Sequence, residues 1–107
     1  MREIDLATFA AAHADGAVVI DVREPQEYVS GHVPGAKLLP LGQLRSRIAD
    51  LPKRDPVYVI CASGSRSLDA AAQLARAGFD AKCVAGGTNA WTAAGLPTMQ
   101  GPRENAA

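Results

Sequence analysis

The strongest structural signal in this chain is the segment Val57-Tyr58-Val59-Ile60-Cys61-Ala62-Ser63-Gly64-Ser65-Arg66-Ser67. Its first four residues, which follow a proline, are β-branched, aromatic and apolar, and they predict a short buried strand. The Ala-rich stretch 67–77 predicts a helix, which a glycine at residue 78 is expected to end. Residues 61–67, called the Cys61 loop below, therefore join a buried strand directly to a helix.

The same alternation extends to both sides of this unit. Strands are also expected at 17–22, 37–39 and 81–84, and helices from residue 5 to about 12, around residues 27–28, at 41–51 and at 89–94. Strands that alternate with helices predict an α/β fold with a mainly parallel sheet and helices on both faces. Ligands of such sheets bind beyond the carboxyl ends of the strands, which points to the residues after Val22, Ile60 and Val84.

Length and charge limit the class of protein. The chain has 107 residues, and its 11 Lys+Arg and 11 Asp+Glu give no net charge. This length suits one domain, expected over 1–97, followed by a loosely ordered tail over 98–107. The charge balance argues against nucleic acid and membrane partners. No signal peptide is evident, and we expect a cytoplasmic protein whose two cysteines stay reduced.

The composition of the Cys61 loop predicts a reactive thiol. A cysteine before a helix N-terminus faces the positive end of the helix dipole, which lowers the pKa of a thiol and favours the thiolate. Gly64 and its small neighbours allow the backbone N–H groups to turn inward as an anion nest. Arg66 can bind an oxyanion or lock the loop, and Ser67 can cap the helix or donate a hydrogen bond. The alternative is that Cys61 is a buried packing residue.

The spacing within the loop narrows the chemistry. Four residues separate Cys61 from Arg66, one fewer than in the related phosphatase loop that cradles a phosphate. A tighter ring is expected to fit a single bound sulfur atom better than a tetrahedral phosphate. A cysteine phosphatase or arsenate reductase is therefore the less favoured alternative.

Two further groups of motifs accompany the loop in order along the chain. They are Asp-Val-Arg-Glu at 21–24 with Glu-Tyr at 27–28 and Gly-His-Val-Pro-Gly-Ala at 31–36, then Gly-Gly-Thr-Asn-Ala-Trp at 86–91 with Ala-Gly-Leu-Pro at 94–97. Together with the Cys61 loop they resemble the rhodanese family of sulfurtransferases, in its single-domain, thiosulfate sulfurtransferase form. The resemblance implies a three-layer rhodanese-like fold with a five-stranded, mainly parallel sheet, and it adds a fifth strand near Ile4.

The resemblance also implies a reaction. Cys61 would take the sulfane sulfur of thiosulfate as a persulfide, and a thiophilic acceptor such as cyanide or a thiol would remove it. The substrate-binding and persulfide-binding residues would be Ala62, Ser63, Gly64, Ser65, Arg66 and Ser67. No cofactor is implied beyond the covalent sulfur. Ala62 stands where many family members carry a basic residue, so a low-molecular-weight persulfide stays open as the donor.

Other roles remain open beside this enzyme. The chain could be a sulfur carrier or a partner-docking module whose sulfur donor or acceptor is a protein. Cys83 is expected to be a packing residue on its strand, with the alternative that it resolves a Cys61 persulfide as a disulfide. Gly86 and Gly87 are expected to turn close to Cys61, and Trp91 to pack its helix on the sheet.

Three residues outside the loop are expected to support it. Asp21 could orient the loop by accepting hydrogen bonds from its backbone or from Arg66, or it could cap the next helix. Arg23 and Glu27 are four residues apart at a helix start, which predicts an ion pair. His32 is expected to hold its own loop by a hydrogen bond rather than to act as a base.

The histidines and cysteines predict no metal site. The two His and two Cys are scattered along the chain without the paired spacing that metal ligands show. His13 follows an Ala-rich helix and is expected to be exposed.

Overall fold

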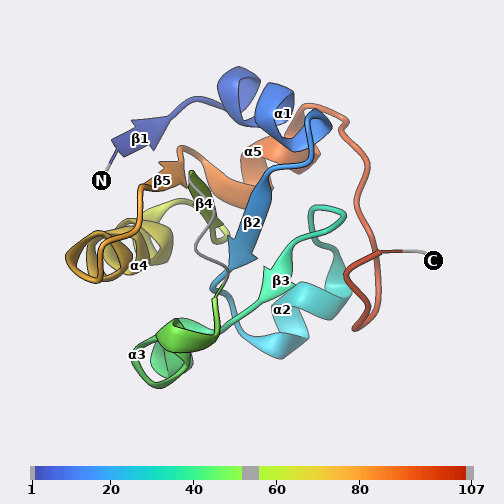
Figure 1. Ribbon diagram of the computed structural model, residues 1–107. Coiled ribbons are helices and arrows are strands. Elements are labelled where there is room, and N and C mark those ends of the chain that lie inside the picture. Colours follow the sequence, from blue (N-terminus) through green and yellow to red (C-terminus); the bar gives the residue numbers. More distant parts are fainter. Residues whose placement is uncertain (1, 52–55, 106–107) are drawn as a thin grey trace.

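A computed structural model describes residues 2–51 and 56–105, and it shows a five-stranded sheet (Figure 1). The strands are β1 (Arg2–Ile4), β2 (Val18–Asp21), β3 (Lys37–Leu38), β4 (Val57–Ile60) and β5 (Ala81–Val84). Their order across the sheet is β1-β5-β4-β2-β3, and all four pairings are parallel. The predicted fold class is confirmed, including the additional strand at Ile4.

Helices cover both faces of the sheet (Figure 1). They are α1 (Leu6–Ala14), α2 (Pro25–Ser30), α3 (Leu44–Arg47), α4 (Ser65–Arg76) and α5 (Gly87–Ala93). Side chains of α3 and α4 join one apolar core, and those of α1, α2 and α5 join the other. Phe9 of α1 meets Trp91 of α5 edge to face at 5.5 Å between ring centroids, so Trp91 packs its helix as predicted.

The central strand β4 explains the two cores. All four of its residues are buried, because successive side chains point to opposite faces of a sheet that is covered twice. Val57 and Val59 enter the core under α3 and α4, together with Cys61, whereas Tyr58 and Ile60 enter the core under α1 and α5. A continuous apolar run at this position is therefore the expected signature of a central parallel strand.

Several predicted helices have different limits: α1 ends at Ala14 and α5 starts at Gly87, each two residues beyond the predicted bound. The segment 41–51 is not one helix, because 3-10 turns at Leu41–Gln43 and Ile48–Asp50 flank the short α3. Gly42 lowers the helix propensity of this segment, while its leucines still reach the core. Helix α4 starts at Ser65, two residues earlier than expected, because Gly64 adopts φ +115° and can serve as its N-cap.

Backbone hydrogen bonds join the C-terminal segment to the end of α2 and to the loop that follows it. His32 and Met99 exchange two such bonds of 2.9 and 2.8 Å, and the Gly101 amide donates to Val29 at 2.8 Å. The Gly35 amide donates to the Glu104 carbonyl at 2.7 Å.

The predicted domain boundary at residue 97 stays a prediction, and residues 1, 52–55 and 106–107 lie outside the described part of the chain. Within the described residues, no helix has the length and apolar character needed to cross a membrane.

Candidate active site

The Cys61 loop lies at the carboxyl edge of the sheet, as the position of its strand predicted. Strand β4 is the middle strand of five, between β5 and β2. The Val22 amide, just past the end of β2, donates to the Ile60 carbonyl at 3.0 Å, so the two strands end side by side. The loop therefore begins at the centre of the sheet and leads directly into α4.

Cys61 is fully buried, and its sulfur lies among hydrogen-bonding groups of its own loop. The Gly64 amide donates to Cys61 Sγ at 3.0 Å. The Cys61 thiol donates to Ser67 Oγ at 3.5 Å, and the Ser67 hydroxyl donates to the Gly64 carbonyl at 3.1 Å. A short rotation of that hydroxyl would let it donate to the sulfur once the thiol has lost its proton.

The surroundings of Cys61 favour its thiolate. Burial raises the pKa of the Cys61 thiol, but hydrogen bonds from the Ser67 hydroxyl and from three backbone amides outweigh burial and hold it below the usual 9.0. The three amides belong to Ser67, Gly64 and Ser63. This arrangement is the anion nest that the small residues of the loop predicted.

The start of α5 packs directly against the back of the loop. The Thr88 amide donates to the Cys61 carbonyl at 2.8 Å, and the Asn89 amide donates to the Ala62 carbonyl at 3.0 Å. Gly87 has φ +56°, and a Cβ atom there would lie 2.6 Å from the Ala62 carbonyl oxygen. The predicted approach of Gly86 and Gly87 to Cys61 is confirmed, and the structure adds the reason why residue 87 must be glycine.

Arg66 is held by Glu27 and not by Asp21. Its two terminal nitrogens donate to the two Glu27 carboxylate oxygens at 2.7 and 2.8 Å, a bidentate pair. Glu27 also accepts from the Glu24 amide at the start of α2. The hydrogen bonds from Arg66 lower the pKa of Glu27 to about 2, so the pair is fully charged at neutral pH. The predicted pair of Arg23 with Glu27 is therefore wrong.

Arg23 pairs instead with Asp21. The guanidinium donates to both Asp21 oxygens, at 3.0 and 2.9 Å, and to the Gly31 carbonyl at 2.9 Å. The Arg23 amide donates to Asp21 as well, at 3.1 Å. Asp21 thus accepts from Arg23 rather than from Arg66, because a buried carboxylate requires the nearest cation that can reach it. Asp21 therefore supports the site indirectly: it holds Arg23, whose guanidinium also donates to the Gly31 carbonyl after α2.

His32 holds the loop after α2 as predicted. Its Nδ1 lies 3.0 Å from the Tyr28 carbonyl, and its ring stacks on the Tyr28 ring at 3.7 Å. His13 differs from its prediction, because it is partly buried and its Nε2 lies 2.7 Å from the Pro34 carbonyl. Both histidines thus have structural contacts with backbone carbonyls.

Cys83 lies on the same face of the sheet as Cys61. It pairs with Val59 across β4 and β5, and it is buried in the same core as Cys61. Burial raises the pKa of the Cys83 thiol, with a smaller contribution from Glu3, whereas the pKa of the Cys61 thiol is lowered. Both cysteines are free thiols. Within 2–51 and 56–105, no three His, Cys, Asp or Glu side chains gather to form a metal site.

The structure is thus an α/β domain in which a buried cysteine, surrounded by hydrogen-bond donors, lies at the carboxyl edge of a five-stranded parallel sheet. Comparison with protein families identifies the family to which this domain belongs. The family model described as the Rhodanese-like domain matches residues 5–94, and the chain belongs to this family.

Individual relatives agree with this assignment. The chain is 34% identical over 102 residues to a protein of Allochromatium vinosum named "Sulfurtransferase", covering 92% of this chain and 95% of that one. It is 38% identical over 82 residues to the "Thiosulfate sulfurtransferase GlpE" of Pseudomonas entomophila, covering 76% and 75%. The crystal structure of a rhodanese-related protein from Thermoplasma volcanium matches with a TM-score of 0.88 at 31% identity, covering 94% and 100%.

One similar protein is larger. The "Putative sulfur carrier protein YrkF" of Bacillus subtilis is 43% identical over 61 residues, which are 57% of this chain and 33% of that protein. The chain thus matches only a third of that relative. Names among these proteins include both sulfurtransferases and a sulfur carrier.

Proposed function

We propose that this protein transfers a sulfane sulfur from thiosulfate or a low-molecular-weight persulfide to a thiophilic acceptor through a persulfide on Cys61. The observation that carries the proposal is the set of hydrogen bonds that ends on Cys61 Sγ and lowers the pKa of its thiol. A thiolate is the form of cysteine that attacks sulfur. Membership of the rhodanese family supports the same chemistry.

The first step loads the sulfur. The Cys61 thiolate uses an electron pair to bond to the outer sulfur of thiosulfate, and the S–S bond of thiosulfate breaks with its electrons on the leaving sulfite. The products are a Cys61 persulfide anion and sulfite, so charge and atoms balance. In the second step cyanide or a thiolate attacks the outer sulfur and releases the Cys61 thiolate. Both steps exchange one sulfur–sulfur or sulfur–carbon bond for another and need no cofactor.

The loop is suited to the intermediate as well as to the thiolate. The amides that donate to Cys61 Sγ would also be next to the outer sulfur of a persulfide, which carries most of its negative charge. Such donors are fixed before the reaction, and they stabilise an anion without reorganisation. Ser67 adds one donor that can turn toward the sulfur.

The charge around the Cys61 loop affects which sulfur donor can bind there. Arg66, the only cationic residue between 61 and 67, forms a bidentate pair with Glu27. Attraction of the thiosulfate dianion therefore depends on the amides rather than on an unpaired cation. The reacting group of a persulfide donor carries at most one negative charge, compared with two on thiosulfate, so both donors belong in the test. The reducing cytoplasm, where a free Cys61 thiol persists, is the compartment we propose.

A sulfur carrier is the second candidate, and the similarity to the Bacillus subtilis protein favours it. A carrier would load Cys61 in the same way but would pass the sulfur to a partner protein. It would turn over slowly with small acceptors. The two candidates therefore share the loading step and differ in the rate of discharge.

A turnover assay tests the proposal. Thiocyanate formation is measured with thiosulfate or glutathione persulfide as donor and cyanide as acceptor, for the native protein, Cys61→Ser and Cys83→Ser. We expect activity in the native protein and in Cys83→Ser, and at least a thousandfold loss in Cys61→Ser, as for removal of a catalytic nucleophile. Full activity of Cys61→Ser would disprove the mechanism, and phosphatase turnover without sulfur loading would favour the phosphatase alternative.

A further inference from the structure

We propose that the groove between α3 and the C-terminal half of α4 binds an acidic segment of a partner protein, with two carboxylates beside an aliphatic side chain. Arg45, Ile48, Gln73, Arg76 and Ala77 line this groove, which we call the α3–α4 groove. Its volume is about 260 Å³. The sulfur chemistry of Cys61 is not needed for this proposal.

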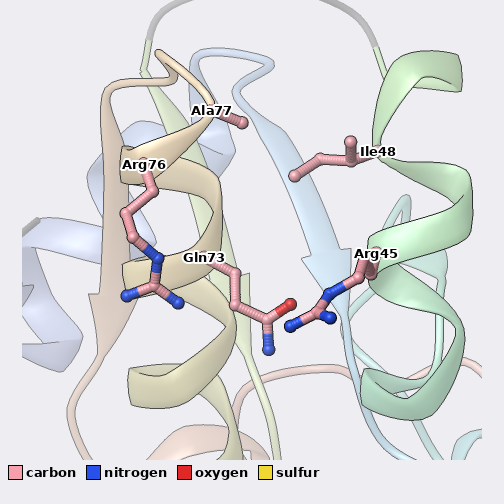
Figure 2. A pocket seen from close by; sticks show the side chains of 5 residues that line it. All are labelled: Arg45, Ile48, Gln73, Arg76 and Ala77. Atoms are coloured by element: carbon pink, nitrogen blue, oxygen red, sulfur yellow. The ribbon is translucent and has the colours of Figure 1, made fainter.

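The two sides of the groove bring donors together from different elements. Figure 2 shows Arg45 and Ile48 on the side of α3, and Gln73, Arg76 and Ala77 on the side of α4. The Arg45 guanidinium extends toward the Gln73 carboxamide, and the Arg76 guanidinium extends along α4 to the level of Gln73 (Figure 2). An amide thus lies between two cations that can each bind a carboxylate bidentately.

The positive charges of Arg45 and Arg76 are not neutralised by a carboxylate of the described residues. Within 2–51 and 56–105, neither Arg45 nor Arg76 forms an ion pair, whereas Arg47 on the same short helix pairs with Asp50 at 3.2 Å. Arg76 in the last turn of α4 also offsets the helix dipole, but that role does not involve Arg45. Two unpaired cations across one groove, on a chain with no net charge, indicate an anionic occupant.

The remaining lining residues indicate more than a bare anion. Ile48 is partly buried and packs against the core that Leu44 and Leu74 share, and Ala77 exposes a methyl group opposite it. An aliphatic side chain can occupy that end of the groove while carboxylates meet the guanidinium groups. The groove is shallow and Arg45, Arg76 and Ala77 are exposed, which suits an extended protein segment better than an enclosed small molecule.

The groove is separate from the reaction centre but lies on the same helix. Gln73 and Arg76 are eight and eleven residues past Ser65, or about 12 and 17 Å along the axis of α4. A partner bound there would leave the mouth of the Cys61 loop open. Asp69 is on the face of α4 that carries Gln73 and Arg76, one turn closer to the loop, and it would repel an acidic segment that reached further.

The test uses ¹⁵N-labelled full-length protein and a synthetic peptide, acetyl-Ala-Glu-Leu-Asp-Leu-Glu-Ala-amide. We expect chemical-shift changes at the amides of Ile48, Gln73 and Ala77 that saturate with peptide and shrink at about 1 M salt, where screening is within about 3 Å. The peptide with Gln and Asn in place of its acids should cause no such changes. Shifts that are absent, that map elsewhere or that persist with the amide peptide would each disprove the proposal.

Variants sharpen the test. Arg45→Glu with Arg76→Glu should abolish the shifts, whereas the matched charge reversal Arg47→Glu outside the groove should leave them, and Asp69→Asn should keep or strengthen them. Unchanged binding by the double variant, with its amide spectrum otherwise native, would overturn the assignment. If acetate or inorganic phosphate alone displaces the peptide completely at equal concentration, the groove is a small-anion site and the peptide assignment is wrong.

Discussion

At the scale of single residues, Cys61 combines two opposing influences on one sulfur atom. Its burial disfavours charge, while the Gly64 amide and the Ser67 hydroxyl favour it. The donors prevail because they are part of the same short loop and are already oriented. Cys83 lies on the neighbouring strand β5, on the same face of the sheet. Its burial outweighs the hydrogen bond from its own backbone amide, so the pKa of its thiol is raised.

The rate at which Cys61 is alkylated reports the pKa of its thiol, because only the thiolate reacts. The rate of Cys61 alkylation by iodoacetamide should rise with pH through a midpoint below 9.0, because the pKa of Cys61 is lowered. Ser67→Ala removes a donor to the thiolate, so the midpoint should move upward while the rate at high pH stays similar. A midpoint above 9.0 in the native protein, or no change in Ser67→Ala, would contradict the role given to the loop.

Glu27 provides the second prediction, on stability. The carboxyl has a pKa of about 2 when folded and a usual value of 4.5, so unfolding takes up protons between these values. Its contribution is full above pH about 4.5 and is lost as the pH falls toward about 2. Glu27→Gln should lower the free energy of unfolding by about 1 kcal/mol at pH 7, a modest figure because a third of each side chain is exposed to solvent.

Urea unfolding across this pH range measures the effect. The difference between Glu27→Gln and the native protein should shrink below pH about 4.5 and vanish near pH about 2. Asp69→Asn is the control, because Asp69 is exposed and forms no ion pair within the described residues, and it should show a smaller difference at pH 7. A difference for Glu27→Gln that stays constant with pH would mean that its ion pair with Arg66 does not contribute.

At the scale of elements, the site depends on α5 as much as on β4 and α4. The first amides of α5 hold two carbonyls of the Cys61 loop, and only a residue without a side chain fits at Gly87. The loop is thus fixed between two helix starts. This contact crosses from one strand end to the next, so it forms only when β4 and β5 are paired.

Gly87→Ala is the third prediction. The new methyl group would collide with backbone carbonyls that cannot rotate away, in addition to the strain of φ +56°. We expect a loss of about 3 kcal/mol in unfolding free energy. Gly16→Ala is the matched control, because Gly16 has φ +84° but open space around it, and it should cost about 1 kcal/mol. Equal losses of unfolding free energy in the two variants would show that the close contact of Gly87 with the Cys61 loop does not affect stability.

The sequence predicted those parts of the fold and site that arise from local pattern. The run 57–60, the small residues after it and Gly78 each carry a signal within a few positions. The pair Arg66–Glu27 joins residues 39 apart, and the helical i,i+4 rule favoured Arg23 as the partner of Glu27 instead. Strand β1 has only three residues, two of them exposed, so no burial pattern could reveal it.

At the scale of the whole molecule, the segment after α5 runs back to α2 and the loop after it, and hydrogen bonds hold it there. The chain passes from Pro97, which accepts from Trp91 Nε1 at 2.8 Å, back beside the loop of His32 (Figure 1). Four backbone hydrogen bonds then join residues 99–104 to residues 29–35. Periodicity could not predict this, because the contacts use backbone groups rather than a face of apolar side chains.

Amide hydrogen exchange tests whether these four backbone hydrogen bonds are stable in solution. The amides of His32, Gly35, Met99 and Gly101 donate to backbone carbonyls and should exchange about tenfold or more slowly than unstructured amides. Exchange at these positions as fast as in a free peptide would show that residues 98–105 form the loose tail that composition suggests.

Locating the transferred sulfur tests directly whether Cys61 carries it. Trypsin places Cys61 in the peptide 55–66 and Cys83 in the peptide 83–103, so mass spectrometry separates the two thiols. After brief treatment with thiosulfate or glutathione persulfide and trapping with iodoacetamide, peptide 55–66 should carry one additional sulfur atom, which cyanide removes. Additional sulfur on peptide 83–103 alone, a Cys61–Cys83 disulfide, or no addition with either donor would contradict this role of Cys61.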